Sequence, residues 1–155
     1  EITTDLVEFS RNTASPKERD AALTYREVVA DLELIGDYCK DVLERIEIKI
    51  HEKLLFDEES VKEYTELYRL SEKALQEVTN ALKQDDLKAI KQVLKKEEHI
   101  DALVDEYRKR HNQRLLDGVC TPMSCNMFLN MLDFTAAIYY HTKKVVRNLL
   151  NAREK

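Results

Sequence analysis

Two pairs of carboxylate residues have a spacing that could hold a metal ion on a helix. Glu33 and Asp37 form the first pair, and Glu97 and Asp101 form the second. Residues four positions apart lie one turn apart on the same helix face, so each pair can present its oxygen atoms together. Carboxylates on facing helices of a bundle bind metal ions in this way. The two pairs are therefore candidate metal ligands, and ordinary solvated surface carboxylates are the alternative.

The second pair lies where the sequence predicts an inner helix face. Apolar residues recur there at steps of three and four, and the two carboxylates occupy two of the steps. The residues at these steps are Leu87, Ile90, Leu94, Glu97, Asp101 and Val104. Two buried like charges need a cation, a basic partner, shared protons or water to compensate them. We therefore expect Glu97 and Asp101 to face the core, or to escape to water at its boundary.

The first pair lies beside an apolar stripe and has a glycine between its members. Gly36 stands in the interior of a predicted helix, between Glu33 and Asp37. A glycine there costs about 1 kcal/mol relative to alanine. We expect another backbone or an ion to approach Gly36 closely and offset this cost.

The cysteines and histidines give weaker signals of metal or redox chemistry. Of the three cysteines in the chain, Cys120 and Cys125 bracket a short segment. A Cys-x4-Cys pair without a second cysteine or histidine pair close by is a weak zinc motif, so reduced thiols in a cytosolic compartment are the favoured interpretation. His99 and His111 are expected at the surface, and the other histidines are no better placed as ligands.

The sequence argues against several classes of function. It contains no G-x-S-x-G, P-loop or H-E-x-x-H motif, and we expect no enzyme. Nucleic acid would require a basic face, whereas the net charge is −5 with both signs mixed along the chain. No apolar run approaches the ~18 residues of a membrane helix, so we expect no direct membrane insertion of this segment.

A few long helices are the elements predicted to position these residues. The chain has only 2 glycines and 2 prolines, and 35% of its residues are charged, a composition typical of helices joined by short links. Ser15-Pro16 and Thr121-Pro122 each place a capping residue before a proline at the first helical position. The prediction is an all-α antiparallel bundle over residues 15–155, with four long helices at 16–53, 58–83, 86–117 and 122–151. Residues 1–14 are expected to be a linker or the tail of a preceding helix.

Three segments resemble the PhoU family of phosphate-regulatory proteins. Residues 31–38 (DLELIGDY) are similar to the family's DLERIGDH helix, and residues 97–103 (EEHIDAL) to its E-x-x-V-D-x-L helix. Residues 110–120 (RHNQRLLDGVC) resemble the H-x-x-R-L-x-x-G-x-C segment of PhoU-like domains fused to sodium/phosphate cotransporters. PhoU proteins consist of two three-helix repeats. On that template the chain supplies the last helix of one repeat and all of the next, as a fragment of a longer protein.

The resemblance also implies metal clusters of iron or zinc, held by paired E-x-x-x-D motifs within each repeat. The first pair of carboxylates matches this motif, but its partner helix is expected outside the chain. The second pair matches as well, but Thr135 and Tyr139 stand where the last helix should present its carboxylates. No cofactor is therefore expected, and iron or zinc at a degenerate site that joins the two pairs across the bundle is the alternative.

The function that the resemblance implies is regulatory. We expect a cytoplasmic domain at the inner face of the cell membrane, part of a sodium/phosphate cotransporter-type protein, which acts on phosphate transport or its regulation through protein contacts. The expected partner is the transporter domain of the same parent chain, and self-association is an open alternative. A helical dimerisation or interaction module without a phosphate role is the second hypothesis. A carboxylate-bridged di-metal oxidase is disfavoured because the Glu-x-x-His ligands are missing.

Overall fold

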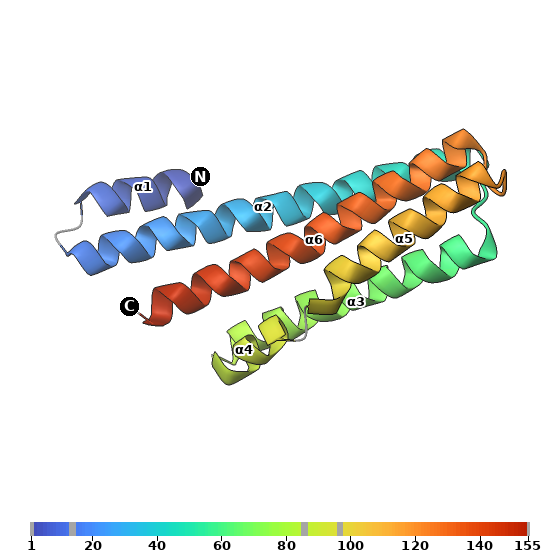
Figure 1. Ribbon diagram of the computed structural model, residues 1–155. Coiled ribbons are helices and arrows are strands. Elements are labelled where there is room, and N and C mark those ends of the chain that lie inside the picture. The colour runs from blue at the N-terminus through green and yellow to red at the C-terminus, as the bar shows by residue number, and fades with distance from the viewer. Residues whose placement is uncertain (1, 13–14, 85–86, 96–97, 155) are drawn as a thin grey trace.

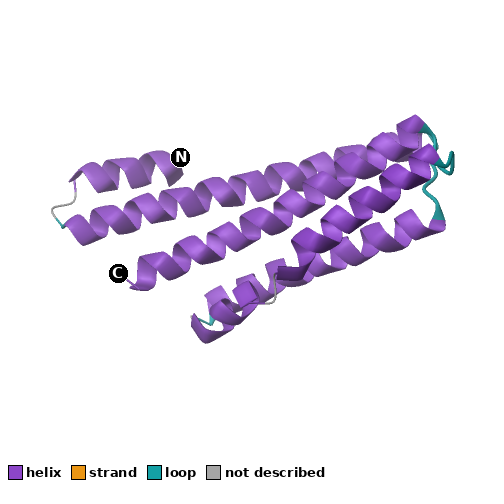
Figure 2. Cartoon of the chain, in the orientation of Figure 1, coloured by secondary structure: helices purple, strands orange, loops and turns teal. Residues whose placement is uncertain are grey.

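The computed structural model describes residues 2–12, 15–84, 87–95 and 98–154 of the chain. All regular structure in these ranges is helical (Figure 2). The helices are, in chain order, α1 (Ile2–Asn12), α2 (Pro16–His51), α3 (Glu58–Lys83), α4 (Leu87–Lys95), α5 (Glu98–Leu116) and α6 (Pro122–Glu154). The predicted all-α antiparallel bundle is confirmed.

The last helix, α6, is the centre of the bundle. It runs antiparallel to α2 along most of the length of that helix, and it also packs against α3, α4 and α5 (Figure 1). Both α2 and α3 pack on α6, and the short helix α1 folds back along the start of α2. Because α6 has neighbours on several sides, it must carry apolar residues around most of its circumference.

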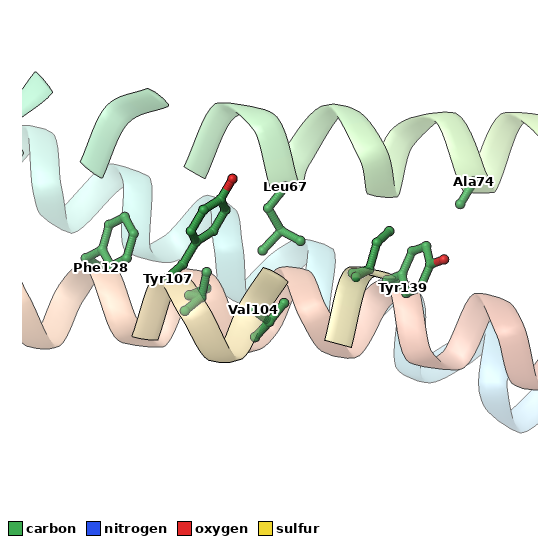
Figure 3. Packing of buried hydrophobic residues seen from close by; sticks show 8 residues of the cluster. Leu67, Ala74, Val104, Tyr107, Phe128 and Tyr139 are labelled. Carbon is green, nitrogen blue, oxygen red and sulfur yellow. The ribbon is translucent and has the colours of Figure 1, made fainter. Parts of the chain in front are cut away.

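Three apolar cores involve α6, and the smallest of them joins α3 and α6 through Val78, Ala81, Val146 and Leu150. The first joins α3, α5 and α6 (Figure 3) and contains the buried residues Leu67, Ala74, Ile100, Val104, Tyr107, Phe128, Leu132 and Tyr139. The second joins α2 and α6 and contains Val28, Ile35, Val42, Ile138, Val145 and Leu149. Leu75 and Leu82 of α3 also pack against the second core, so α3 contributes to both sides of the bundle.

The helix ends follow the capping signals of the sequence with one exception. The side chain of Asp57 accepts a hydrogen bond from the Ser60 backbone at 3.0 Å and caps α3. Thr121 caps α6 in the same way, through a bond of 3.2 Å from the Ser124 amide. Ser15 precedes Pro16 in an extended conformation, but its side chain makes no capping hydrogen bond. The start of α2 therefore relies on the proline, whereas α3 and α6 have side-chain caps.

Two predicted segments can be compared with the described helices. Residues 1–14 were expected to be a linker or the tail of a helix, and Ile2–Asn12 form the separate helix α1. The described residues of the helix expected over 86–117 are helical on both sides of residues 96–97, as α4 and α5. Residues 96–97 lie outside the described residues.

The buried face of α5 is offset by one residue from the predicted one. Its buried side chains are Ile100, Val104, Tyr107 and His111. Asp101, which the prediction placed on the core seam, is 82% exposed at its side chain. The apolar steps of α5 start at Ile100, so Asp101 points away from the core. Its carboxylate is hydrated and avoids the cost of desolvation.

Among the described helices, none is both long enough and apolar enough to cross a bilayer.

Candidate functional site

The predicted carboxylate ligands do not gather in the structure. Glu33 and Asp37 are exposed on α2, and Asp101 is exposed on α5, where Lys143 of α6 lies 3.7 Å from its carboxylate. Glu97 lies outside the described residues. In the described part of the chain, no three carboxylates approach one another closely enough to share a metal ion.

Neutral side chains fill the positions on α6 where the family pattern calls for carboxylates. Thr135 is buried, and its hydroxyl lies 3.1 Å from the Tyr64 hydroxyl of α3. Tyr139 is buried in the first core. No other backbone approaches Gly36 as expected, because no atom of another described segment lies within 4 Å of the point where its Cβ would stand. The described residues therefore do not fit an E-x-x-x-D metal cluster.

A buried ion pair joins the start of α3 to the end of α5. The guanidinium of Arg114 donates two hydrogen bonds to the carboxylate of Glu63, one of them 3.2 Å long. Glu63 is buried, with 5% of its surface exposed. Arg114 also lies 3.7 Å from the capping carboxylate of Asp57. Such two-pronged arginine–carboxylate contacts fix geometry as well as charge, so Arg114 sets the position of α5 on α3.

The same cluster contains a buried histidine. His111 was expected at the surface, but only 1% of it is exposed, and its ring stacks on Phe128 with centroids 4.0 Å apart. It is buried because it lies four residues after Tyr107 on the inner face of α5. The Nδ1 atom of His111 is 3.3 Å from the Ser60 hydroxyl and 3.2 Å from the Arg114 guanidinium.

The surroundings of this cluster shift two of its pKa values. Burial, and after it the charge of Arg114, lower the pKa of His111. Burial alone would raise the pKa of Asp57, but the hydrogen bonds from Ser60 and the charge of Arg114 lower it overall. At neutral pH the imidazole is therefore neutral and the Asp57 carboxylate is ionised.

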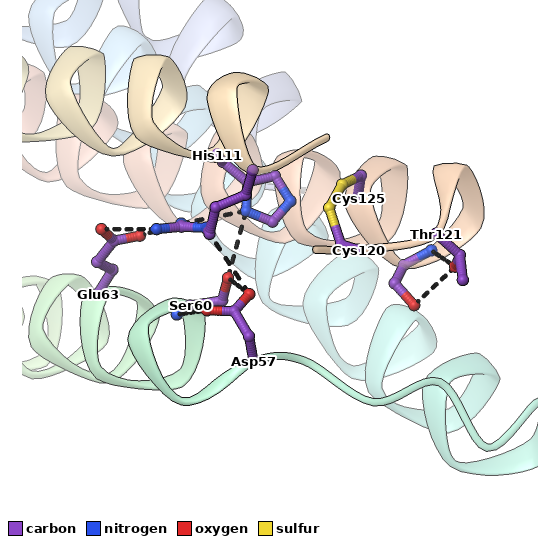
Figure 4. The surroundings of a disulfide bond; sticks show 9 residues. Asp57, Ser60, Glu63, His111, Cys120, Thr121 and Cys125 are labelled. Carbon is purple, nitrogen blue, oxygen red and sulfur yellow. Dashed lines mark hydrogen bonds and ion pairs between the residues drawn. A yellow bond between two sulfur atoms is a disulfide. The ribbon is translucent and has the colours of Figure 1, made fainter. Parts of the chain in front are cut away.

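A disulfide lies beside this cluster, between α5 and α6 (Figure 4). It joins Cys120 to Cys125, whose Cα atoms are 5.9 Å apart. The sequence favoured reduced thiols for this pair, whereas the structure joins the two sulfurs in a disulfide. The turn that starts α6 brings the two cysteines together, as the 2.9 Å hydrogen bond from the Cys125 amide to the Thr121 carbonyl shows. Cys39 is a free and exposed thiol.

A second buried carboxylate, which the sequence did not single out, joins α2 to α6. Asp31 is 1% exposed, and its Oδ1 atom lies 2.8 Å from His141 Nδ1 and 3.1 Å from Lys144 Nζ. The hydrogen bond and the charge of Asp31 raise the pKa of Lys144. Asp31 begins the DLELIGDY segment and aligns with Asp133 when residues 29–38 are compared with residues 131–140. That alignment was the available signal, but it gave no partner for the carboxylate.

An apolar groove of about 590 Å³ lies over α6 between α2 and α3. The residues of its apolar lining include Val42, Leu43, Ile46, Tyr68, Leu75 and Ile138. Leu43 is 61% exposed and Tyr68 is 50% exposed. A continuous apolar surface of this kind, open to water between two helices, is typical of a site that binds another helix.

Comparison with known families gives one result that bears on the fold and the function. Residues 64–140, from the second turn of α3 to the middle of α6, match the PhoU domain. The match includes the segments 97–103 and 110–120 that resemble the family, and the segment 31–38 lies before it. Neither the curated proteins nor the solved structures give a significant match. The match over residues 64–140 therefore supports the PhoU family for this chain.

Proposed function

We propose that this chain is a regulatory domain of a sodium/phosphate cotransporter-type membrane protein and acts on phosphate transport through protein contacts. The PhoU match of residues 64–140 carries the proposal, because it supports a regulatory role in phosphate homeostasis. The cotransporter context rests on the resemblance of residues 110–120 to PhoU-like domains fused to such transporters. In that context the domain lies in the cytoplasm, at the inner face of the cell membrane.

The groove between α2 and α3 is the surface through which we expect the domain to act. Its exposed apolar residues, Leu43 and Tyr68, face a channel whose floor is α6. An amphipathic helix is the ligand that such a groove accommodates, because it can cover apolar surface from both walls at once. The occupant that we propose is an amphipathic helix of the same parent protein. Its arrival or departure is the step that couples this domain to transport.

No catalytic step belongs to this proposal. The carboxylates of the family's metal motif are exposed or outside the described residues, and Thr135 and Tyr139 are neutral. We therefore expect no iron or zinc bound by Glu33, Asp37, Glu97 and Asp101. An Asp101→Asn variant should carry the same metal content as the parent protein when both are measured by elemental analysis.

The parent gene and a deletion test this function at two levels. The gene should encode membrane-spanning segments next to this domain, and a gene without them would contradict the cotransporter context. Deletion of residues 15–155 should change phosphate uptake by cells that carry the parent protein, when uptake is compared between phosphate-rich and phosphate-poor medium. Uptake that responds to phosphate in the same way with and without the domain would contradict the regulatory role.

The exposed groove also favours a second candidate, a dimerisation module without a phosphate role. Two copies could cover each other's grooves, and the protein would then form a dimer whose dissociation depends on concentration. Sedimentation equilibrium of the wild type and of Leu43→Lys separates the two candidates. A stable dimer that the variant dissociates, together with unchanged phosphate uptake in the deletion, would favour this module over the regulatory domain.

A further inference from the structure

The disulfide and the buried histidine beside it form a group of three metal-ligating residues that the proposed function does not use. Figure 4 shows the imidazole of His111, from α5, next to Cys120 and Cys125 at the start of α6. One ligand atom from each residue, an imidazole nitrogen and two sulfurs, lies within 4.8 Å of the others. These residues come from two helices and the turn between them, so the fold and not the local sequence brings them together.

The histidine has a free nitrogen inside the protein. His111 is 1% exposed, and no described residue offers a hydrogen bond to its Nε2 atom. Cys125 is also 1% exposed. A buried polar atom without a partner costs about 1–3 kcal/mol, which makes such an atom a marker for a ligand. The cost disappears when a metal ion binds to the nitrogen.

We propose that Cys120, Cys125 and His111 bind one Zn²⁺ ion when the disulfide is reduced. Nitrogen and thiolate sulfur are the donors that zinc prefers, at about 2.0–2.1 Å and 2.3 Å from the ion. Donors of a tetrahedral zinc site then lie about 3.3–3.8 Å apart. Since the three donor residues already lie within 4.8 Å of one another, side-chain rotations can close the site. A water molecule is the fourth ligand of the zinc ion.

The disulfide form and the zinc form exclude each other because they use the same two sulfurs. Reduction breaks the S–S bond with two electrons from a thiol or phosphine reductant and leaves two thiols. A thiol reductant supplies the two protons itself and becomes a disulfide, whereas a phosphine becomes its oxide and water supplies the oxygen and the two protons. Binding of Zn²⁺ then releases the two thiol protons to water, because the metal takes thiolates. In a reducing compartment such as the cytosol the pair is reduced, so the zinc form is the one expected there.

The surroundings of His111 suit a metal ligand. Burial and the charge of Arg114 lower the pKa of His111, and neutral imidazole is the form that binds a metal. An ion on Nε2 requires the remaining proton on Nδ1, which can donate to the Ser60 hydroxyl at 3.3 Å. That hydroxyl in turn donates to Asp57, so a carboxylate orients the histidine through one intermediate. Arg114, whose guanidinium also approaches Nδ1, keeps its two bonds to Glu63 in this state.

Spectroscopy with Co²⁺ as the probe tests the proposal on the whole chain. The protein is reduced with a phosphine, the reductant is removed without oxygen, and Co²⁺ is added. We expect one equivalent of Co²⁺ to give a thiolate-to-cobalt charge-transfer band, which Zn²⁺ abolishes by displacement. The same chain with its disulfide intact is the matched control and should give no such band. Absence of the band in the reduced protein would overturn the proposal.

Variants identify the ligands. Cys120→Ser removes a ligand that is only partly buried, so the fold should persist, and we expect at least a tenfold loss of Zn²⁺ affinity. His111→Gln should also weaken binding at least tenfold. Cys39→Ser removes the exposed free thiol and should leave affinity unchanged. Circular dichroism checks the fold of each variant. Equal affinity in Cys120→Ser and the parent, or loss of affinity in Cys39→Ser, would contradict the assignment.

Discussion

The side chain of Arg114 lies between α3 and α5 with its guanidinium held against the carboxylate of Glu63. Replacement by methionine keeps most of the apolar stem and leaves that carboxylate buried. Among the described residues, Arg110, at 3.6 Å, is the cation that then remains near it. We expect Arg114→Met to lower the free energy of unfolding by about 3 kcal/mol, because an unpaired buried charge remains. Urea denaturation followed by circular dichroism measures this change.

An exposed arginine of α5, Arg108, provides the control for Arg114. Arg108 pairs with Asp133, and their side chains are 40% and 47% exposed. Arg108→Met should therefore cost no more than about 1 kcal/mol. Similar losses in the two variants would show that the Arg114–Glu63 pair has no special role in the fold.

His111 gives the stability of the disulfide form a dependence on pH. Burial lowers its pKa below the ordinary value of 6.5, so the unfolded chain takes up the proton at a higher pH than the folded chain. The free energy of unfolding is then fully present above about pH 6.5 and falls as the pH drops below that value. Urea denaturation at a series of pH values should show this fall.

Two variants distinguish His111 from the other titrating groups. His111→Gln should remove most of the slope between about pH 6.5 and 5, where few other groups titrate. His51→Gln changes a side chain that is 84% exposed and should leave the slope as it is. A slope that survives in His111→Gln would mean that another residue causes it.

Among the elements, the helix starts show how far the sequence predicted local structure. Ser15-Pro16, Asp57 and Thr121-Pro122 each mark a true start, because capping and proline chemistry act within one turn. The inner face of α5 was misplaced by one residue. Asp101 is exposed, which agrees with the alternative that it escapes to water, whereas His111 was expected at the surface and is buried. Pairing across helices, as in Arg114 with Glu63 or Asp31 with His141, depends on packing between distant segments and has no local signature.

The residues that precede α2 and α3 allow a test of helix capping by mutation, because one of them makes a capping hydrogen bond and the other does not. Asp57→Ala removes the side chain that accepts from the Ser60 amide and attracts Arg114, so we expect a loss of about 1–2 kcal/mol in the free energy of unfolding. Ser15→Ala removes a side chain without a capping bond and should change it by less than about 0.5 kcal/mol. Urea denaturation measures both, and equal losses would contradict the assigned caps.

The two glycines of the chain also provide a pair of variants with opposite expected effects on stability. Gly118 ends α5 with φ 69°, so Gly118→Ala should destabilise the protein by about 1 kcal/mol. Gly36 lies inside α2 with open space around it, so Gly36→Ala should stabilise the protein by about 0.5–1 kcal/mol. Thermal denaturation should shift in opposite directions for the two variants. A loss of stability in Gly36→Ala would show that something does approach this position.

Across the whole molecule, the sequence predicted the class of fold and the segments that resemble PhoU, and it did not predict the candidate sites. The composition and the long apolar stripes were enough for an antiparallel helical bundle. The groove between α2 and α3 arises because both helices pack on α6, and this arrangement cannot be seen in either helix alone. Of the carboxylates selected by spacing, Glu33, Asp37 and Asp101 are exposed and Glu97 lies outside the described residues. The buried groups Asp31, Glu63 and His111 became visible only in the folded chain.

Phosphate uptake by cells that carry groove variants of the parent protein tests the regulatory role most directly. Leu43→Lys places a charge in the groove at a residue that is 61% exposed, so the fold should be retained while helix binding is lost. Leu116→Lys changes a residue that is 80% exposed at the end of α5, outside the groove, and is the matched control. We predict that Leu43→Lys alters the response of uptake to external phosphate and that Leu116→Lys does not. An unchanged response in Leu43→Lys, with the variant protein folded and present at normal levels, would contradict regulation through this groove.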